Sequence, residues 1–174
     1  MKRAIIVVII VGIMGILIHA ASASSPVISI EPSHITNVSP SDEFTVNITV
    51  DPNGTEIYGA DYILYFNNIV LRALRQNKGA FLGGFELTNK IDNPNGKVDY
   101  GEFRTSSGGV TDPGVLATIE FEVRSPGVSE LRFGEVTLSD PDGNETQNVT
   151  INNGTVETTG AQPSSPFLIY GYVS

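Results

Sequence analysis

The sequence predicts an all-β protein: a two-sheet sandwich, arranged as a nine-stranded jelly roll, behind an N-terminal signal peptide helix. Apolar and polar residues alternate in segment after segment, and clusters of Gly, Pro, Asn and Asp separate these segments. No sustained 3.6-residue period occurs beyond the N-terminal region. A sheet with one apolar face must cover it, and two packed antiparallel sheets do so most simply.

The N-terminus has the features of an export signal. Lys2 and Arg3 are basic, residues 4–18 are apolar or Gly, and 21–23 read Ala-Ser-Ala, the small-x-small form of a cleavage site. An apolar run of 15 residues is shorter than the roughly 20 that a bilayer-spanning helix needs. We therefore expect residues 1–23 to be a cleaved signal peptide and the protein to be secreted or on the cell surface. A membrane anchor through the uncleaved segment is the alternative.

The β domain is expected at residues 25–157, followed by a linker at 158–166 and a strand-like end at 167–174. That end either starts a truncated second domain or folds back as an edge strand. The strands are expected at 27–31, 44–50, 57–66, 70–74, 81–87, 97–103, 114–123, 129–139 and 149–156. Alternation places Tyr62 in the core with Ala60 and Leu64, and puts Asp61, Ile63 and Tyr65 on the opposite face.

Composition argues against several classes of function. The chain has 10 basic and 19 acidic residues, so nucleic acid is not an expected partner. It has no cysteine, and His34 is the only histidine after the predicted signal. A catalytic triad and a zinc site both lack their usual residues. The protein is therefore not expected to be an enzyme.

Two segments resemble calcium loops. Residues 91–103 (IDNPNGKVDYGEF) follow EF-hand spacing around Gly96, but the first ligand position is Ile91, which cannot bind a cation. A turn leading into a strand is the preferred interpretation. Asp140, Asp142 and Asn144 are weak metal candidates, because the same residues also specify an ordinary turn.

N-glycosylation motifs agree with export. Asn-x-Ser/Thr sequons begin at Asn37, Asn47, Asn53, Asn144, Asn148 and Asn153. A Thr- and Asn-rich β protein also produces such triplets by chance, so we expect one or two to be used at most.

Binding is the function class that remains. Sugar-binding surfaces favour Trp, which the chain lacks. A carbohydrate-binding module would have to stack polysaccharide on Tyr65 or Tyr100. The mixed polar and apolar face formed by Asp61, Ile63 and Tyr65 favours protein recognition instead.

Four stretches in order resemble the cohesin family, and together they cover nearly the whole predicted domain. They are residues 39–50 (SPSDEFTVNITV), 57–74 (IYGADYILYFNNIVLRAL), 108–123 (GGVTDPGVLATIEFEV) and 134–156 (GEVTLSDPDGNETQNVTINNGTV). The resemblance implies a nine-stranded jelly roll. It also implies a non-catalytic module that binds dockerin modules of extracellular, polysaccharide-degrading enzymes on one sheet face.

The resemblance also implies candidate partner-binding residues. The family often carries Asn-x-Asp on strand three, and here that place holds Gly59-Ala60-Asp61, so Asp61 matches and Gly59 departs. Residues 97–103 resemble strand five, which would present Asp99, Gly101 or Glu102 according to its register. The expected site is therefore Asp61, Ile63, Tyr65, Asp99 and Glu102. No cofactor is expected, and calcium would arrive with the dockerin. A carbohydrate-binding module and a passive cell-surface adhesin or spacer are the alternatives.

Overall fold

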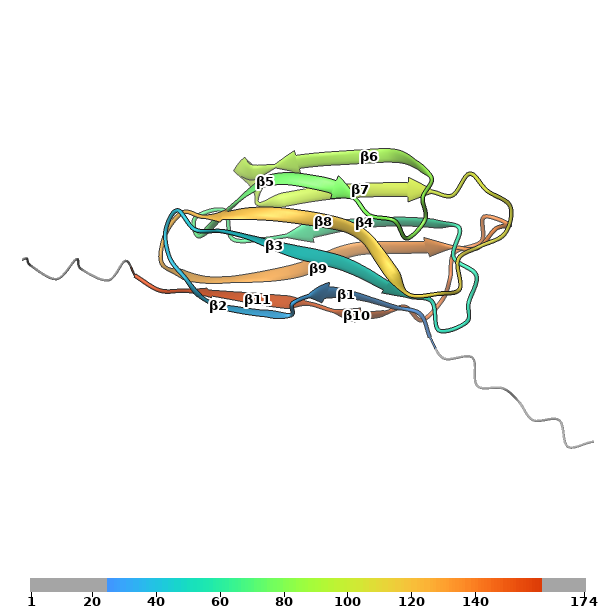
Figure 1. The fold of residues 1–174 in the computed structure, drawn as a ribbon, viewed down its shortest axis with the longest axis horizontal. Helices are drawn as coiled ribbons and strands as arrows, with labels where there is room; N and C mark the ends of the chain where they lie inside the picture. The colour runs from blue at the N-terminus through green and yellow to red at the C-terminus, as the bar shows by residue number, and fades with distance from the viewer. Residues whose placement is uncertain (1–24, 161–174) are drawn as a thin grey trace, which may run out of the picture.

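The computed structural model describes residues 25–160 as two β-sheets packed face to face (Figure 1). The predicted signal peptide, the strand-like end and the linker from residue 161 lie outside the described residues. Within residues 25–160, no helix is long and apolar enough to cross a membrane.

One sheet has five strands and the other has six. The five-stranded sheet runs in the order β10 (Thr150–Asn152), β1 (Val27–Glu31), β3 (Glu43–Asp51), β8 (Gly114–Val123), β5 (Leu71–Lys78). The six-stranded sheet runs in the order β2 (His34–Val38), β11 (Gly154–Thr158), β9 (Gly127–Ser139), β4 (Gly59–Tyr65), β7 (Lys97–Phe103), β6 (Phe85–Asp92). The pairs β1–β10 and β2–β11 are parallel, and the other neighbours are antiparallel.

The predicted sandwich is confirmed, but the described residues form eleven strands rather than nine. One additional strand, β2, was not predicted, and the predicted strand at 149–156 is divided into β10 and β11. The chain leaves β1 in one sheet and enters β2 in the other, and it crosses again between β10 and β11. The sequence missed β2 because its side chains are mostly exposed, so it shows no apolar alternation.

Strand β6 starts four residues later than the predicted segment at 81–87. Phe81 and Leu82, which suggested an inward-facing strand, are buried in the turn before it. The strand itself has an irregular register between Glu86 and Thr88 and leaves Leu87 61% exposed. A bulge of this kind breaks the two-residue alternation on which the sequence prediction relied.

The core lies between the sheets and is built from the inward faces of the strands. Phe121 of β8 stacks on Phe44 with ring centroids 5.6 Å apart, and it meets Phe66 edge-on at 5.3 Å. Tyr62 stacks on Tyr100 at 5.6 Å on the side of the six-stranded sheet. The placement of Tyr62, Ala60 and Leu64 in the core is confirmed, since all three are at most 2% exposed.

The segment that resembles a calcium loop is a turn, as predicted. Asn93–Asn95 form one turn of 3-10 helix, whose N-cap Asp92 accepts hydrogen bonds from the Asn95 backbone and side-chain amides at 3.3 and 2.7 Å. Gly96 closes the turn in the left-handed region, at φ 58°. A Cβ there would overlap the carbonyl oxygen of Phe66, so the position requires glycine.

A buried amide joins the two sheets at the side where β5 faces β6 and β7. Gln76 of β5 is 8% exposed and accepts a hydrogen bond from the Tyr62 hydroxyl at 3.1 Å. Its amide nitrogen donates to the Asn89 side chain at 3.0 Å and to the Asp99 carbonyl at 2.9 Å. Burial raises the pKa of Tyr62 well above its usual value, so its hydroxyl remains a donor. Gln76 therefore ties β5 to the backbone of β7.

A second side-chain amide, that of Asn93, links β5 to the turn before β7. The Asn93 side chain exchanges two hydrogen bonds with the backbone of Ala73, accepting from its amide at 2.8 Å and donating to its carbonyl at 2.9 Å. This is the pattern that one strand offers another, supplied here by a side chain. It satisfies backbone groups of β5, which is an edge strand.

Removing the buried amide should destabilise the fold. Gln76→Ala leaves the buried Tyr62 hydroxyl without its acceptor, and we expect the free energy of unfolding to fall by about 2–3 kcal/mol. Urea denaturation measures this change. Asn77→Ala, at the exposed neighbouring position, is the matched control and should stay within about 0.5 kcal/mol. Equal effects of the two substitutions would show that the hydrogen bonds of Gln76 contribute nothing to the free energy of unfolding.

Candidate functional site

The candidate site is the outer face of the six-stranded sheet, over β9, β4, β7 and β6. Pairing with both neighbours fixes the register of β4, so that Asp61 lies opposite Gly101 of β7 and Thr137 of β9. Ile63 lies opposite Asp99 in the next row. These side chains point away from the core because successive residues of a strand alternate between its faces.

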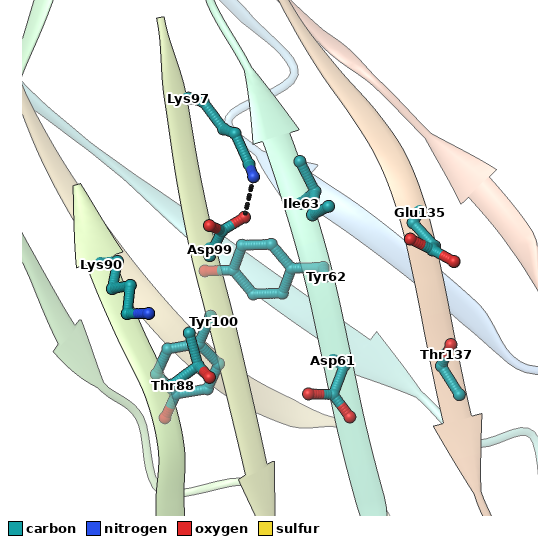
Figure 2. A pocket seen from close by; sticks show the side chains of 10 residues that line it. All are labelled: Asp61, Tyr62, Ile63, Thr88, Lys90, Lys97, Asp99, Tyr100, Glu135 and Thr137. Atoms are coloured by element: carbon teal, nitrogen blue, oxygen red, sulfur yellow. Dashed lines mark ion pairs between the residues drawn. The ribbon is translucent and has the colours of Figure 1, made fainter. Parts of the chain in front are cut away.

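The middle of this face is a shallow hollow of about 370 Å³. Figure 2 shows β4 contributing Asp61 and Ile63, between Glu135 and Thr137 of one neighbouring strand and Asp99 of the other. The residues lining it are Asp61, Tyr62, Ile63, Thr88, Lys90, Lys97, Asp99, Tyr100, Glu135 and Thr137. Of the predicted site residues, the structure brings Asp61, Ile63 and Asp99 together here.

Asp61 lies across the backbone of β7. A Cβ added at Gly101 would overlap its Oδ1 atom and come within 3.2 Å of its Cγ, so the absence of a side chain at 101 makes room for the carboxylate. Partial burial raises the pKa of Asp61 above its ordinary value of 3.8. Among the described residues, no lysine, arginine or histidine forms an ion pair with it. Asp61 is therefore a partly desolvated acceptor without a cationic partner.

The second carboxylate of the hollow is already paired. Lys97 Nζ lies 3.0 Å from Asp99 Oδ1 on the same strand (Figure 2). The hydrogen bond to Asp99 raises the pKa of Lys97, so the ammonium group stays charged. The pair is about three-quarters shielded from solvent on both side chains. The hollow thus presents the Asp61 carboxylate, one neutralised pair, and the Glu135 and Lys90 side chains, which form no ion pair among residues 25–160.

Tyr65 lies beyond the hollow on the same face and is 37% exposed. The Arg132 guanidinium lies over its ring, 5.4 Å from the centroid. A Cβ at Gly134 would come within 2.6 Å of the ring, so the tyrosine rests on this glycine. Arg132 covers the ring face that a sugar would use for stacking.

Two residues that the sequence analysis considered for contact with a ligand are buried. Glu102 was expected on the partner surface, but it is fully buried and faces inward, one position out of phase with Asp99 and Gly101. Its carboxylate accepts hydrogen bonds from the Gly84 amide at 2.7 Å and the Tyr100 hydroxyl at 2.9 Å. Tyr100 is 1% exposed, so it cannot stack on polysaccharide.

Several residues of the face were missed by the sequence analysis. Thr88 and Lys90 come from β6, whose displaced boundary concealed them, and Glu135 and Thr137 come from β9. Lys97 carried a signal, since it shares its strand and its face with Asp99 at a spacing of two. Glu135 and Thr137 carried no such signal, because a bulge beside Ile63 shifts the register between β9 and β4.

Gly59 has a structural reason to depart from the expected asparagine. A Cβ at this position would overlap the Ser139 hydroxyl oxygen from β9. The hydroxyl therefore occupies the space where the missing side chain would begin. Ser139 is the cross-strand neighbour of Gly59, one row of the sheet away from Asp61, and the sequence analysis did not consider it.

The loop with Asp140, Asp142 and Asn144 is organised by its own amides. Asp140 accepts hydrogen bonds from the backbone of Asp142 at 2.9 Å and of Asn144 at 2.8 Å, and from the Asn144 side chain at 3.0 Å. These bonds, with the Asn144 side chain first, lower the pKa of Asp140. In residues 25–160, no three His, Cys, Asp or Glu side chains gather as metal ligands would.

The fold and its uncovered sheet face are those of a β-sandwich binding module. A family model described as the cohesin domain matches residues 29–158. The chain belongs to this family. No curated protein matches the chain.

Solved cohesin structures share the fold at low sequence identity. A non-cellulosomal cohesin from the archaeon Archaeoglobus fulgidus has a TM-score of 0.63 and 17% identity, over 78% of this chain and 90% of that one. A type I cohesin from Pseudobacteroides cellulosolvens has a TM-score of 0.64 and 23% identity, over 80% and 95%. A type I cohesin–dockerin complex from Clostridium thermocellum has a TM-score of 0.66 and 18% identity, over 78% and 100%.

The geometry predicts that Gly101 positions the Asp61 carboxylate. Gly101→Ala should swing that carboxylate outward into water and bring the pKa of Asp61 toward its ordinary value, while the free energy of unfolding changes by no more than about 1 kcal/mol. Titration of the carboxyl carbon by NMR measures the pKa. Gly134→Ala, on the same face but against Tyr65, is the matched control and should leave Asp61 unchanged. An unaltered Asp61 titration in Gly101→Ala would contradict this role.

Proposed function

We propose that the chain is an extracellular, non-catalytic module that binds a dockerin-type protein module on the outer face of β9, β4, β7 and β6. Family membership and the cohesin–dockerin complexes among its structural neighbours support this proposal. The observation that carries it is the uncovered hollow around Asp61, whose carboxylate forms no ion pair within residues 25–160.

The chemistry of the hollow suits a partner that donates hydrogen bonds. Asp61 accepts from a Ser, Lys or Arg side chain of the partner, and a charge-assisted bond of this kind is stronger than a neutral one. Because Asp61 is already partly desolvated, the partner removes less water from it than from a fully hydrated carboxylate. Ile63 and Tyr65 add apolar contact beside it.

The residues of this chain near Asp61 set which dockerins it recognises. Gly59 and Ser139 replace the amide that the family resemblance leads one to expect beside Asp61, so the set of recognised dockerins differs from that of cohesins with asparagine there. Calcium enters the complex through the dockerin rather than through residues 25–160 of this chain. The role that follows is to hold dockerin-bearing enzymes of polysaccharide degradation together or at a surface.

The central prediction concerns Asp61. Asp61→Ala should weaken binding of a purified dockerin module from the same source by about 2 kcal/mol, a roughly 30-fold rise in Kd, with folding intact. Isothermal titration calorimetry with and without a calcium chelator measures this. Glu43→Ala, an exposed carboxylate on the other sheet, should leave the affinity unchanged. Equal affinities for all three proteins would remove Asp61 from the site. Retention on cellulose or chitin without a dockerin would favour the carbohydrate-binding alternative, and failure to bind either would favour a passive spacer.

The pKa shift of Asp61 predicts opposite effects of pH on binding and on folding. Only the deprotonated carboxylate accepts from a cationic donor, so binding should be lost as the pH falls through the raised pKa, earlier than for an ordinary aspartate. In the free protein, the raised pKa means that ionisation opposes folding. The stability from this group is fully present below 3.8 and is lost as the pH rises through the folded pKa.

Asp61→Asn separates these two effects. The variant should bind weakly at every pH and should not be less stable than the parent at pH 7. Titration calorimetry and thermal unfolding across pH 3–7 measure both quantities. A parent protein whose affinity stays constant down to pH 3.8 would show that Asp61 ionisation plays no part.

A further inference from the structure

The asparagines of this chain are divided sharply by position. Six lie between residues 54 and 143, and none of them begins an Asn-x-Ser/Thr sequon. Seven lie outside that interval, and six of these begin a sequon. The chain supplies Thr and Ser throughout its length, so composition alone does not account for this separation.

The asparagines with and without sequons are also separated in the fold. The segment without sequons contains β4, β5, β6, β7, β8 and β9, and so all four strands of the proposed docking face. The sequons belong to β2 and β3 and to the turns around β3, β10 and β11. Figure 1 shows β1, β2, β10 and β11 along one side of the sandwich and β5 and β6 along the other. Most of the sequons therefore gather at the side away from the docking strands β7 and β6.

That side carries two edge strands, and of these two only β2 is interrupted by a bulge. Among residues 25–160, β2 pairs only with β11 and β10 pairs only with β1, so each forms an edge of its sheet in this part of the chain. Such edges promote association between molecules unless bulk, charge or a bulge blocks them. At the opposite side, the β5 edge is met by the side chains of Asn89 and Asn93.

Five of the six sequon asparagines are exposed, and within residues 25–160 the side chains of two of these, Asn37 and Asn148, make no hydrogen bond beyond an adjacent residue. Asn37 is exposed at φ 61° on β2, where two residues of β2 bulge out between its pairings with Val156 and Thr158. Among the described residues, its amide donates only to the neighbouring Thr36 hydroxyl, at 3.2 Å. Asn148 is exposed at φ 60° in the bend before β10 and makes no side-chain hydrogen bond to the described residues.

The other four sequon asparagines are engaged or covered. Asn47 is half-buried in the middle of β3, between two paired strands, and accepts from the Thr118 hydroxyl at 3.0 Å. Asn53 donates to the Ser25 carbonyl at 2.7 Å, and Asn144 donates to Asp140 at 3.0 Å. Asn153 accepts from the Phe133 amide at 2.9 Å.

We propose that Asn37 and Asn148 are N-glycosylated and that their glycans shield the edges of β2 and β10 while the docking face stays bare. The amide nitrogen attacks the anomeric carbon of a lipid-phosphate-linked oligosaccharide, supplied with its transferase by the export pathway. A C–N bond forms, the C–O bond to phosphate breaks, the lipid phosphate leaves with the electron pair, and the amide loses one proton. The inference rests on export and not on dockerin binding, so either proposal can fail without the other.

Peptide mapping of the chain recovered from its source tests the assignment. Cleavage after glutamate separates residues 32–43, with Asn37, from 44–56, with Asn47 and Asn53, and places Asn148 and Asn153 together in 146–157. Mass spectrometry with electron-transfer fragmentation should find glycan mass on Asn37 and Asn148 and an unmodified Asn47. Unmodified asparagine at both positions would overturn the proposal, and a glycan on Asn47 would overturn the structural selection.

Variants test the shielding role in the same source. Asn37→Asp and Asn148→Asp remove the acceptor but keep a residue that tolerates the left-handed region. The double variant should lose both glycan masses and should shift by several-fold toward larger species in size-exclusion chromatography. Asn47→Asp is the matched control and should change neither mass beyond the substitution itself nor association. A double variant that stays as monomeric as the parent would refute the shielding role.

Discussion

The whole site depends on the register of one strand. β4 is paired along its length with β7 on one side and with β9 on the other, so both ladders fix the same alternation. Three of its side chains enter the core, and Asp61, Ile63 and Tyr65 go outward. A slip of one residue would place the Asp61 carboxylate in the core and the Tyr62 ring in water, which makes the register strongly specified. The composition of this candidate face is thus a consequence of how the core packs.

Buried polar side chains form hydrogen bonds between particular strands, which the apolar core cannot provide. Gln76 holds the backbone of Asp99, and Glu102 holds the Gly84 amide at the entry to β6. Both groups act from beneath the strand that carries Asp99 and Gly101. Because each is satisfied by hydrogen bonds, it fixes position without the penalty of an unpaired buried group. The chain reaches this precision without disulfides, since it contains no cysteine.

Sequence reasoning succeeded where alternation was unbroken and failed where it was interrupted. The inward and outward residues of β4 follow from its pattern alone. Glu102 was misplaced because the register of its strand was left open between Asp99, Gly101 and Glu102, and a carboxylate was not expected inside. Alternation from Asp99 alone would have turned Glu102 inward. The bulge at Leu87 and the sheet-crossing turns gave no such signal, because they depend on partners distant in the sequence.

Glycines on the strands beside β4 explain why its outer side chains lie low on the sheet. Asp61 rests on Gly101 and Tyr65 rests on Gly134, so each finds room beside its own strand instead of standing upright. A face built in this way is shallow, and a partner helix can approach its backbone closely. The paired Lys97 and Asp99 contribute no net charge, which leaves the two carboxylates of Asp61 and Glu135 against the single ammonium group of Lys90, a net negative charge in the hollow. With the chain at a net charge of −9, a cationic partner surface is drawn to this face and a strongly acidic one is repelled.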